Sequence, residues 1–428
     1  MEQLKTFFSF ADPNIVSVVV GAVLLTASSA VVGTFTFLKK KALVGDAVAH
    51  AVLPGICLAF MLAGNKNPLV LIIGAFVTGW LSLVVMDFIT ERSKIKEDTA
   101  IALVLSVSFG IGILLLTNIQ HSGNAAQTGL ESFLFGKAAA LVGQDLVVFS
   151  IVAIILIVLV AFFFKELKLI AFDENFAKAI GLPVKGINLL LTSLTVLAVV
   201  TGIQAVGVVL MAAMLITPAA AARFWTNDVL IMTLLAAFLG AFAGLSGAFI
   251  SYTAPSMPTG PWIVMIISII ALISFFFAPK RGIIFRSYEQ ARLQQTILQE
   301  NVLKELYRLG EIDDDMFRAR STEELVARRH FPKGRLKTTL RRLCQQGYLS
   351  QDDGLWQLTN EGQQKGKRTV KLHRLWELYL SKYMRIEPDH VHEDAETIEH
   401  VITPEIEAEL ERIMDFPDRD PHDSKIPY

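Results

Sequence analysis

The chain has 428 residues, of which 53% are hydrophobic, and its mean hydropathy is +0.50. This is too apolar for a soluble protein of that length. The net charge is only -1, but residues 1–285 carry 16 Lys and Arg with 13 Asp and Glu, whereas residues 286–428 carry 23 and 27. We therefore expect a membrane domain over 1–285 and a charged domain outside the membrane after it.

Nine apolar segments of the first part have the length of membrane spans, for which about 20 residues are needed. If they alternate in direction and the C-terminus is cytosolic, 13 Lys and Arg lie on the cytosolic side and 3 lie outside. This asymmetry is typical of a multi-pass protein of the bacterial inner membrane. We therefore expect an all-α polytopic membrane domain, with spans at about 15–38, 42–62, 68–90, 99–117, 141–164, 187–205, 206–222, 229–251 and 261–278.

The charged part begins with a pattern of three helices, at about 287–308, 322–329 and 335–346. A hairpin is predicted over 348–358, because Asp353-Gly354 is a strong turn signal between β-prone residues. Helix, helix, helix and hairpin is the order of a winged helix-turn-helix, which we place at 286–365. Further helices are predicted at 360–384, 388–402 and 404–414, and the last part, 366–428, is expected to be an α-rich domain.

One ionisable pair interrupts the second predicted span. Asp46 and His50 are four residues apart, so both side chains lie on one face of a helix. Charged groups inside a span cost several kcal/mol by most accounts unless they are paired or functional. Carboxylate and imidazole are ligands for Mn²⁺, Fe²⁺ and Zn²⁺. The alternative is that the two groups only neutralise each other or lie at the cytosolic interface.

The sequence around this pair, Leu-Val-Gly-Asp-Ala-Val-Ala-His-Ala-Val-Leu-Pro-Gly, resembles the signature of the manganese/zinc/iron ABC permease family. The likeness covers about 10–284, and it includes 133–136, 172–183 and 206–223. It implies that Asp46 and His50 line the metal path. It also implies three partners, namely an ABC ATPase subunit, an extracytoplasmic metal-binding protein and a second permease chain. The motif does not distinguish manganese from zinc or iron.

The resemblance also places the contact with the ATPase. In permeases of this type, the loop after a Pro-Ala-Ala-rich helix end forms a coupling helix, which maps onto 219–228 with Arg223, Asn227 and Asp228. The charged segment 172–181 is expected to support it. The chain has no Gly-rich loop with Lys-Ser/Thr that would bind ATP phosphates. We therefore predict a permease that is not itself an enzyme, and ATP hydrolysis by a separate subunit.

Two clusters of carboxylates and imidazoles occur near the C-terminus. Glu396, Glu399 and His400 share one helical face, and so do His373 and Glu377. His392 lies just before the first trio. The alternative to a metal site is a solvent-exposed, charged helix face on which the histidines occur by chance. The spacing favours a site for a divalent metal ion.

Residues 299–427 resemble the iron- and manganese-dependent repressors of the diphtheria toxin repressor family. The likeness rests on the winged helix, 358–362, 373–380, 391–396, 399–400 and 421–427. It implies a metal-binding and dimerisation domain over 366–428. A first metal site would then include Glu396, Glu399 and His400, and a second would include His373, Glu377 and His392.

The first predicted site departs from the repressor pattern at two positions. The family draws further ligands from its first helix, where this chain has Asn301 and Lys304. Lysine cannot bind a metal as an ammonium, so this site is incomplete unless Glu300, Glu305 or the backbone substitutes. The second site is expected to be intact. A carboxylate at 396, where iron-type members have Cys, suits Mn²⁺ better than a thiolate would.

The prediction is therefore the permease subunit of an importer for Mn²⁺, or for Zn²⁺ or Fe²⁺, with a domain that senses cytosolic metal and regulates transport. No organic cofactor is expected. A membrane-tethered metal-dependent transcription regulator is the alternative, and a cation efflux carrier is a further one. DNA binding is not favoured, because residues 286–428 sum to a charge of about -4.

Overall fold

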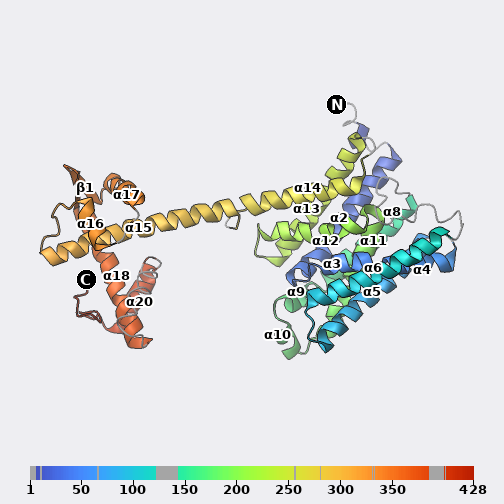
Figure 1. Cartoon of the computed structure of the whole chain (residues 1–428), viewed down its shortest axis with the longest axis horizontal. Helices are drawn as coiled ribbons and strands as arrows, with labels where there is room; N and C mark the ends of the chain where they lie inside the picture. The colour runs from blue at the N-terminus through green and yellow to red at the C-terminus, as the bar shows by residue number, and fades with distance from the viewer. Residues whose placement is uncertain are drawn as a thin grey trace. The chain divides into compact units, whose positions relative to one another are not determined.

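The computed structural model describes residues 6–9, 12–64, 67–121, 143–254, 257–279, 281–329, 331, 333–384, 400 and 402–428 (Figure 1). It divides into two compact units, Met1–Phe285 and Arg286–Tyr428. The division falls where the density of charged residues rises in the sequence. The predicted stretch 133–136 lies outside the described residues.

The first unit is helical over nearly all of its described residues. Its elements in chain order are α2 (Pro13–Leu38), α3 (Val44–Ala51), α4 (Leu53–Ala63), α5 (Pro68–Arg92), α6 (Glu97–His121), α8 (Gly143–Phe162), α9 (Phe164–Phe172), α10 (Glu174–Ala179), α11 (Val184–Val206), α12 (Val208–Arg223), α13 (Val229–Thr253) and α14 (Thr259–Phe277).

The helices confirm a polytopic membrane domain, but not its predicted span count. Within the described residues, seven helical spans are long and apolar enough to cross a membrane, with α3 and α4 together forming one of them. An eighth is added if α8 and α9, which are bent by 68° at their junction, form one span. The predicted span 206–222 corresponds to α12, which has only 16 residues. The count of nine is therefore not confirmed.

The centre of this unit is α2, which packs against α13, α12, α11 and α8. Small residues let the backbones approach closely. A Cβ atom placed on Gly240 of α13 would lie 2.7 Å from the Thr26 carbonyl oxygen of α2. Such close helix crossings are typical of membrane proteins, where packing rather than water exclusion holds helices together.

The chain reverses sharply between α11 and α12. Gly207 has a φ of 92°, which is accessible to glycine but not to residues with a Cβ atom. Met211 of α12 consequently folds back onto Gly202 of α11, where its sulfur takes up the space that a Cβ atom at this position would need. The sequence pattern placed the boundary between two spans at 205 and 206, and the structure locates the turn at Gly207.

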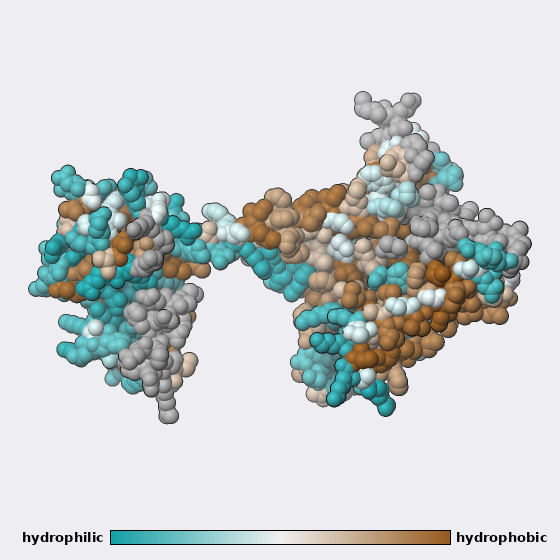
Figure 2. All heavy atoms as spheres, in the orientation of Figure 1, coloured by the Kyte–Doolittle hydropathy of each residue, from teal (hydrophilic) through white to brown (hydrophobic). Residues whose placement is uncertain are grey.

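The outer surface of the first unit is apolar along two neighbouring helices. Figure 2 shows hydrophobic residues gathered over α5 and α6, whereas the second unit is largely hydrophilic. On both helices the exposed apolar side chains recur every three or four residues, so each helix presents one apolar face. These side chains are Leu69, Ile73, Val77 and Leu81 on α5, and Leu103, Val107, Ile111 and Leu114 on α6. Such faces suit contact with lipid.

The second unit contains the predicted winged helix, which the structure confirms. Its elements are α15 (Ile283–Asp313), α16 (Thr322–Arg328), α17 (Lys333–Gln345), β1 (Leu349–Asp352) and β2 (Leu355–Leu358), followed by α18 (Asn360–Tyr383) and α20 (Pro404–Met414). β1 and β2 pair in antiparallel fashion. Asp353 and Gly354 both have positive φ, as a two-residue hairpin turn of this kind requires. The helix predicted at 388–402 lies almost wholly outside the described residues.

Two apolar clusters hold this unit together. The winged helix is built on a core that includes Leu306, Leu340 and Trp356. The helices α18 and α20 meet around Leu375 and Leu410. The N-terminal half of α18 also approaches α15 closely, because a Cβ atom on Gly366 would lie 2.8 Å from the Leu303 carbonyl oxygen.

Candidate metal centres

Asp46 and His50 both lie on α3, which continues through Val52 into α4 to make one candidate span, Val44–Ala63. The His50 Nε2 atom is 3.6 Å from Asp46 Oδ1, and the side chains are 22% and 44% exposed. The His50 ring packs edge-on against Phe109 of α6, with ring centroids 5.1 Å apart. Its other nitrogen, Nδ1, is buried and has no hydrogen-bond partner among the described residues. The pair thus has one exposed carboxylate and an imidazole whose Nε2 atom faces it.

The local sequence explains why this pair sits on a short helix. The apolar residues of α3 are buried on its other face, and α3 ends at Val52 because Pro54 lies in the first turn of α4. Asp46 lies in the first turn of α3 and His50 in the last turn, where the helix dipole favours a carboxylate and an imidazolium respectively. Among the described residues, no group of three or more His, Cys, Asp or Glu could hold a metal ion. One chain therefore supplies two side-chain ligands here.

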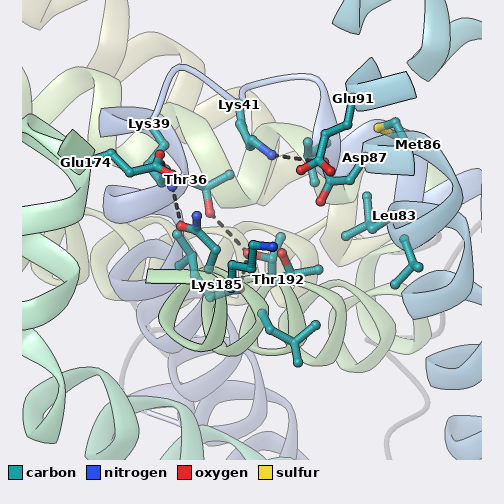
Figure 3. Close-up of a pocket in the computed structure, with 16 residues that line it drawn as sticks. Thr36, Lys39, Lys41, Leu83, Met86, Asp87, Glu91, Glu174, Lys185 and Thr192 are labelled. Carbon is teal, nitrogen blue, oxygen red and sulfur yellow. Dashed lines mark hydrogen bonds and ion pairs between the residues drawn. The ribbon is translucent and has the colours of Figure 1, made fainter. Parts of the chain in front are cut away.

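A cavity of about 510 Å³ lies at the end of the unit where α2 and α5 finish and α11 begins. Figure 3 shows Lys39 beside Glu174 on one side of it and Lys41 beside Asp87 on the other. The Lys39 Nζ atom is 3.8 Å from Glu174 and also donates to Asn188, while Lys41 lies 3.3 Å from Asp87. Burial lowers the pKa of Lys39, and the nearby Glu174 opposes that shift.

These contacts bring together charged residues from the ends of several helices, including Lys39 and Lys41, which the sequence pattern placed on the cytosolic side. They join the end of α2 to α5, α10 and α11. Glu174 also begins the short helix α10, so Lys39 ties that helix to the α2–α3 corner. The α2–α3 corner leads directly into α3, which carries Asp46. Sequence reasoning did not pair Lys39 with Glu174, because their contact spans 135 positions, although Glu174 lies in the segment 172–181 that was expected to support the ATPase contact.

The predicted ATPase-coupling residues form the turn between α12 and α13. Arg223 donates to the Thr226 carbonyl oxygen at 3.4 Å, and Arg281 donates to the Arg223 carbonyl oxygen and to Asn227. Asp228 caps α13 by accepting from the Ile231 amide at 2.9 Å. No separate helix forms over 219–228, because 219–223 is the end of α12 and the rest is a turn. These side chains therefore have structural partners within the unit.

The neighbouring segment, predicted as a supporting contact, forms a short exposed helix. Asp173 caps α10 by accepting from the Phe176 amide at 2.8 Å. Phe172, Phe176 and Ile180 are each more than half exposed, while Ala177 is buried. This gives α10 and its flanks an apolar outer face beside charged residues.

In the second unit, His373 and Glu377 come together with Lys304. His373 Nε2 lies 3.1 Å from Glu377 Oε1, and His373 Nδ1 lies 3.0 Å from Lys304 Nζ. Both ring nitrogens are thereby engaged. The side chains of His373 and Glu377 are 0% and 2% exposed, and Lys304 is 0% exposed. The remaining predicted ligands, His392, Glu396 and Glu399, lie outside the described residues.

His400 makes a different contact. Its Nδ1 atom lies 2.6 Å from Glu300 Oε2, with side-chain exposures of 1% and 20%. Glu300 is one of the residues that the sequence suggested as a substitute at the first site. The carbonyl oxygen of the neighbouring Asn301 side chain is buried without a hydrogen-bond partner among the described residues. Glu300 and His400 thus bring one oxygen and one nitrogen donor together, whereas the other cluster contains a lysine, which is not a metal ligand as an ammonium.

Comparison with known proteins relates both units to families. Residues 11–278 match the ABC 3 transport family, and residues 359–428 match the iron dependent repressor, metal binding and dimerisation domain. The manganese transport system membrane protein MntC of Bacillus subtilis is 42% identical over 375 residues, which cover 87% of this chain and 86% of that protein.

Two further relatives cover the membrane unit. The zinc transport system membrane protein TroC of Treponema pallidum is 41% identical over 291 residues, covering 68% of this chain and 97% of that protein. The structure of PsaBC from Streptococcus pneumoniae in complex with Fab matches with a TM-score of 0.60 and 35% identity, covering 67% of this chain and 99% of that one. With a matched region of 11–278 and relatives of this similarity, the chain belongs to the ABC 3 transport family.

Proposed function

We propose that the chain is the membrane permease subunit of an ABC importer that brings a divalent transition metal ion into the cytosol. The observation that carries this proposal is the Asp46–His50 pair, 3.6 Å apart, inside a candidate membrane span of a protein from this transport family. Ionisable groups in a span are costly, and they mark ion pathways in membrane proteins. The chain would lie in the bacterial inner membrane with its second unit in the cytosol.

The transported ion is proposed to be Mn²⁺. The two donors are a carboxylate oxygen and an imidazole nitrogen, a set that suits Mn²⁺, Fe²⁺ and Zn²⁺. The relatives named above are described as manganese and zinc systems, and the one that covers most of this chain is a manganese system. That coverage extends into the second unit.

A second permease chain would complete the binding site. Two side-chain donors leave most coordination positions of such an ion open, since zinc takes four ligands in proteins and manganese favours six oxygen-rich ones. Asp46 is 44% exposed on the isolated chain, so it is accessible to a neighbouring subunit. A two-fold pair of identical or related chains would present two carboxylates and two imidazoles to one ion. An extracytoplasmic metal-binding protein would deliver the ion.

The ATPase subunit is proposed to dock on the turn between α12 and α13 and on α10 with its flanks. On α10 and its flanks, the exposed Phe172, Phe176 and Ile180 provide an apolar contact surface, and charged residues surround it. This surface would support a main contact at the turn that carries Arg223, Asn227 and Asp228, which hydrogen bonds hold in one shape. Lys39 then connects α10 to the corner that leads into α3.

The second unit is proposed to regulate transport from the cytosolic side. Its residues 359–428 match a metal-binding and dimerisation domain, and His400 lies against Glu300 in it. A divalent ion held there would link α15 to the segment that precedes α20. Binding that differs by about 1–3 kcal/mol between two arrangements would shift the equilibrium between them by about 5- to 150-fold. An importer gains from such inhibition once the cytosol is replete with metal.

Competitive uptake of manganese, zinc and iron tests this proposal. Vesicles would contain the chain with its ATPase and binding protein, and each radioactive ion would be offered against an excess of the others, with and without ATP. We expect ATP-dependent uptake in which unlabelled manganese competes best. Absence of any ATP-dependent metal uptake would refute the importer, and stronger competition by zinc or iron would refute the choice of metal alone.

A further inference from the structure

A lysine ammonium lies inside the second unit, where a charged group is expensive unless it is paired. Lys304 of α15 has no exposed surface, and its Nζ atom lies 3.0 Å from His373 Nδ1 of α18. His373 in turn lies 3.1 Å from Glu377, one helical turn further along α18. The three side chains thus form a row that crosses from one helix to the other.

Hydrogen-bond chemistry fixes the roles in this row. A lysine ammonium is a donor only, so His373 Nδ1 accepts from Lys304. A neutral imidazole that accepts at one nitrogen carries its proton on the other. His373 Nε2 therefore donates to Glu377. The ammonium and the carboxylate offset each other's charge, and the imidazole joins them, which is the kind of pairing that buried charges require.

The same row does not fit a divalent metal ion. A metal needs a nitrogen lone pair, and the lone pair on His373 Nδ1 is engaged by Lys304. An ion bound near Glu377 would also lie beside an ammonium, and the two positive charges would repel each other in a region sheltered from water. The repressor resemblance and the residues present thus disagree at the second predicted site.

We propose that the Lys304 ammonium takes the place of the metal ion between α15 and α18. A metal that bridges helices fixes the angle between them, and a protonated lysine held by His373 and Glu377 does the same without any exchangeable ion. The junction is reinforced nearby by Arg374 of α18, whose guanidinium donates to both oxygens of Glu311 on α15 at 3.0 and 2.7 Å.

This inference rests on the proposed regulatory function and narrows it. The α15–α18 junction would remain assembled whether metal is scarce or abundant. Any response to cytosolic metal would then come from the part of the unit around Glu300 and His400. The second unit would be a sensor with one adjustable contact and one permanent contact, rather than a sensor with two metal sites.

Metal stoichiometry of the purified full-length chain tests the inference. Equilibrium dialysis against Mn²⁺ followed by elemental analysis gives the ions bound per chain, for the native protein and for His373→Gln, His400→Ala and Lys304→Glu. We expect His373→Gln to leave the stoichiometry unchanged. Lys304→Glu, which replaces the internal cation by a carboxylate, should add one ion per chain, and this ion should be lost again in the double variant with His373→Gln.

Hydrogen exchange provides the second measurement, which does not depend on whether Lys304→Glu folds. In the His400→Ala background, the protection of α18 amides should be the same in Mn²⁺ and in chelator. In Lys304→Met, protection should fall at least about tenfold, and Mn²⁺ should not restore it. A loss of one ion per chain in His373→Gln, or a chelator-dependent loss of α18 protection in the His400→Ala background, would overturn the inference. Loss of Mn²⁺ response in His400→Ala bears only on the regulatory proposal.

Discussion

The contact between Lys39 and Glu174 is expected to transmit the movement of α10 to the metal-binding helix. Replacing Lys39 by Met removes the charge but keeps the length of the side chain. The pair is 3.8 Å apart, and the lysine is 12% exposed while the glutamate is 39% exposed. Fully exposed pairs contribute about 0.2–1 kcal/mol, and loss of one partner of a buried pair costs about 3–5 kcal/mol. Because the distance is long and the glutamate is partly exposed, we expect this pair to contribute about 1 kcal/mol.

A coupling energy of about 1 kcal/mol corresponds to a change of about fivefold in a rate or equilibrium. Since a contact can shift an equilibrium only by its own differential energy, this is the largest effect that we expect. Lys39→Met should therefore lower metal uptake per ATP hydrolysed by up to about fivefold. Binding of the ATPase subunit should not change, because Lys39 faces the cavity rather than the exposed face of α10.

The assay compares transport and ATP hydrolysis in the same vesicles for Lys39→Met, Glu174→Gln and the double variant. If the pair acts as a unit, the double variant should be no worse than either single one. Lys41→Met is the matched control, because Lys41 lines the same cavity but pairs with Asp87 of α5, at 3.3 Å, instead of with Glu174. Multiplied losses in the double variant, or an equal loss in Lys41→Met, would refute the reasoning.

Three further changes follow from particular contacts. Asp228→Ala should destabilise the membrane unit by about 1 kcal/mol through loss of the α13 cap, seen as a lower midpoint of thermal unfolding, whereas Asp228→Asn should retain most of the stability. Burial of Glu407 raises the pKa of its carboxyl, but hydrogen bonds from Lys371 and Arg368 outweigh burial, so this pKa is lowered. Its contribution should be complete above the ordinary pKa of about 4.3 and should be lost as the pH falls through the lowered pKa, so Glu407→Gln should lower stability more at pH 7 than at pH 3. Removal of residues 299–428 should leave initial uptake intact and abolish its decline in vesicles preloaded with Mn²⁺ on the cytosolic side; an identical response of both proteins would contradict a regulatory role.

The local patterns of the sequence predicted the fold well. Apolar stretches located the membrane helices, and Asp353-Gly354 located the hairpin of the winged helix, because both features depend on neighbouring residues. The span count was less certain because hydropathy alone does not reveal helix length. The single residue Gly207, with its positive φ, separates α11 from α12, and α12 has only 16 residues.

The metal sites were harder to predict, since they depend on contacts between distant segments. The spacing of Asp46 and His50 predicted their proximity, and the structure places them 3.6 Å apart. For the second unit, the sequence indicated that Lys304 could not be a ligand, but it assigned that residue to the first site. Only the packing of α15 on α18 shows Lys304 beside His373, which belonged to the site expected to be intact.

The most direct test of the metal path measures manganese uptake by assembled transporter carrying Asp46→Asn or His50→Gln. His121→Gln is the control, because that histidine is exposed at the end of α6 and hydrogen-bonds the Thr117 carbonyl oxygen in its own helix. Mutation of residues that only support metal ligands lowers metal affinity or activity by about 10- to 100-fold, so loss of a ligand itself should lower uptake by at least about 100-fold. We predict this loss in both variants, with normal uptake in the control and undiminished binding of the ATPase subunit. Native uptake rates in both Asp46→Asn and His50→Gln would contradict the proposed metal path.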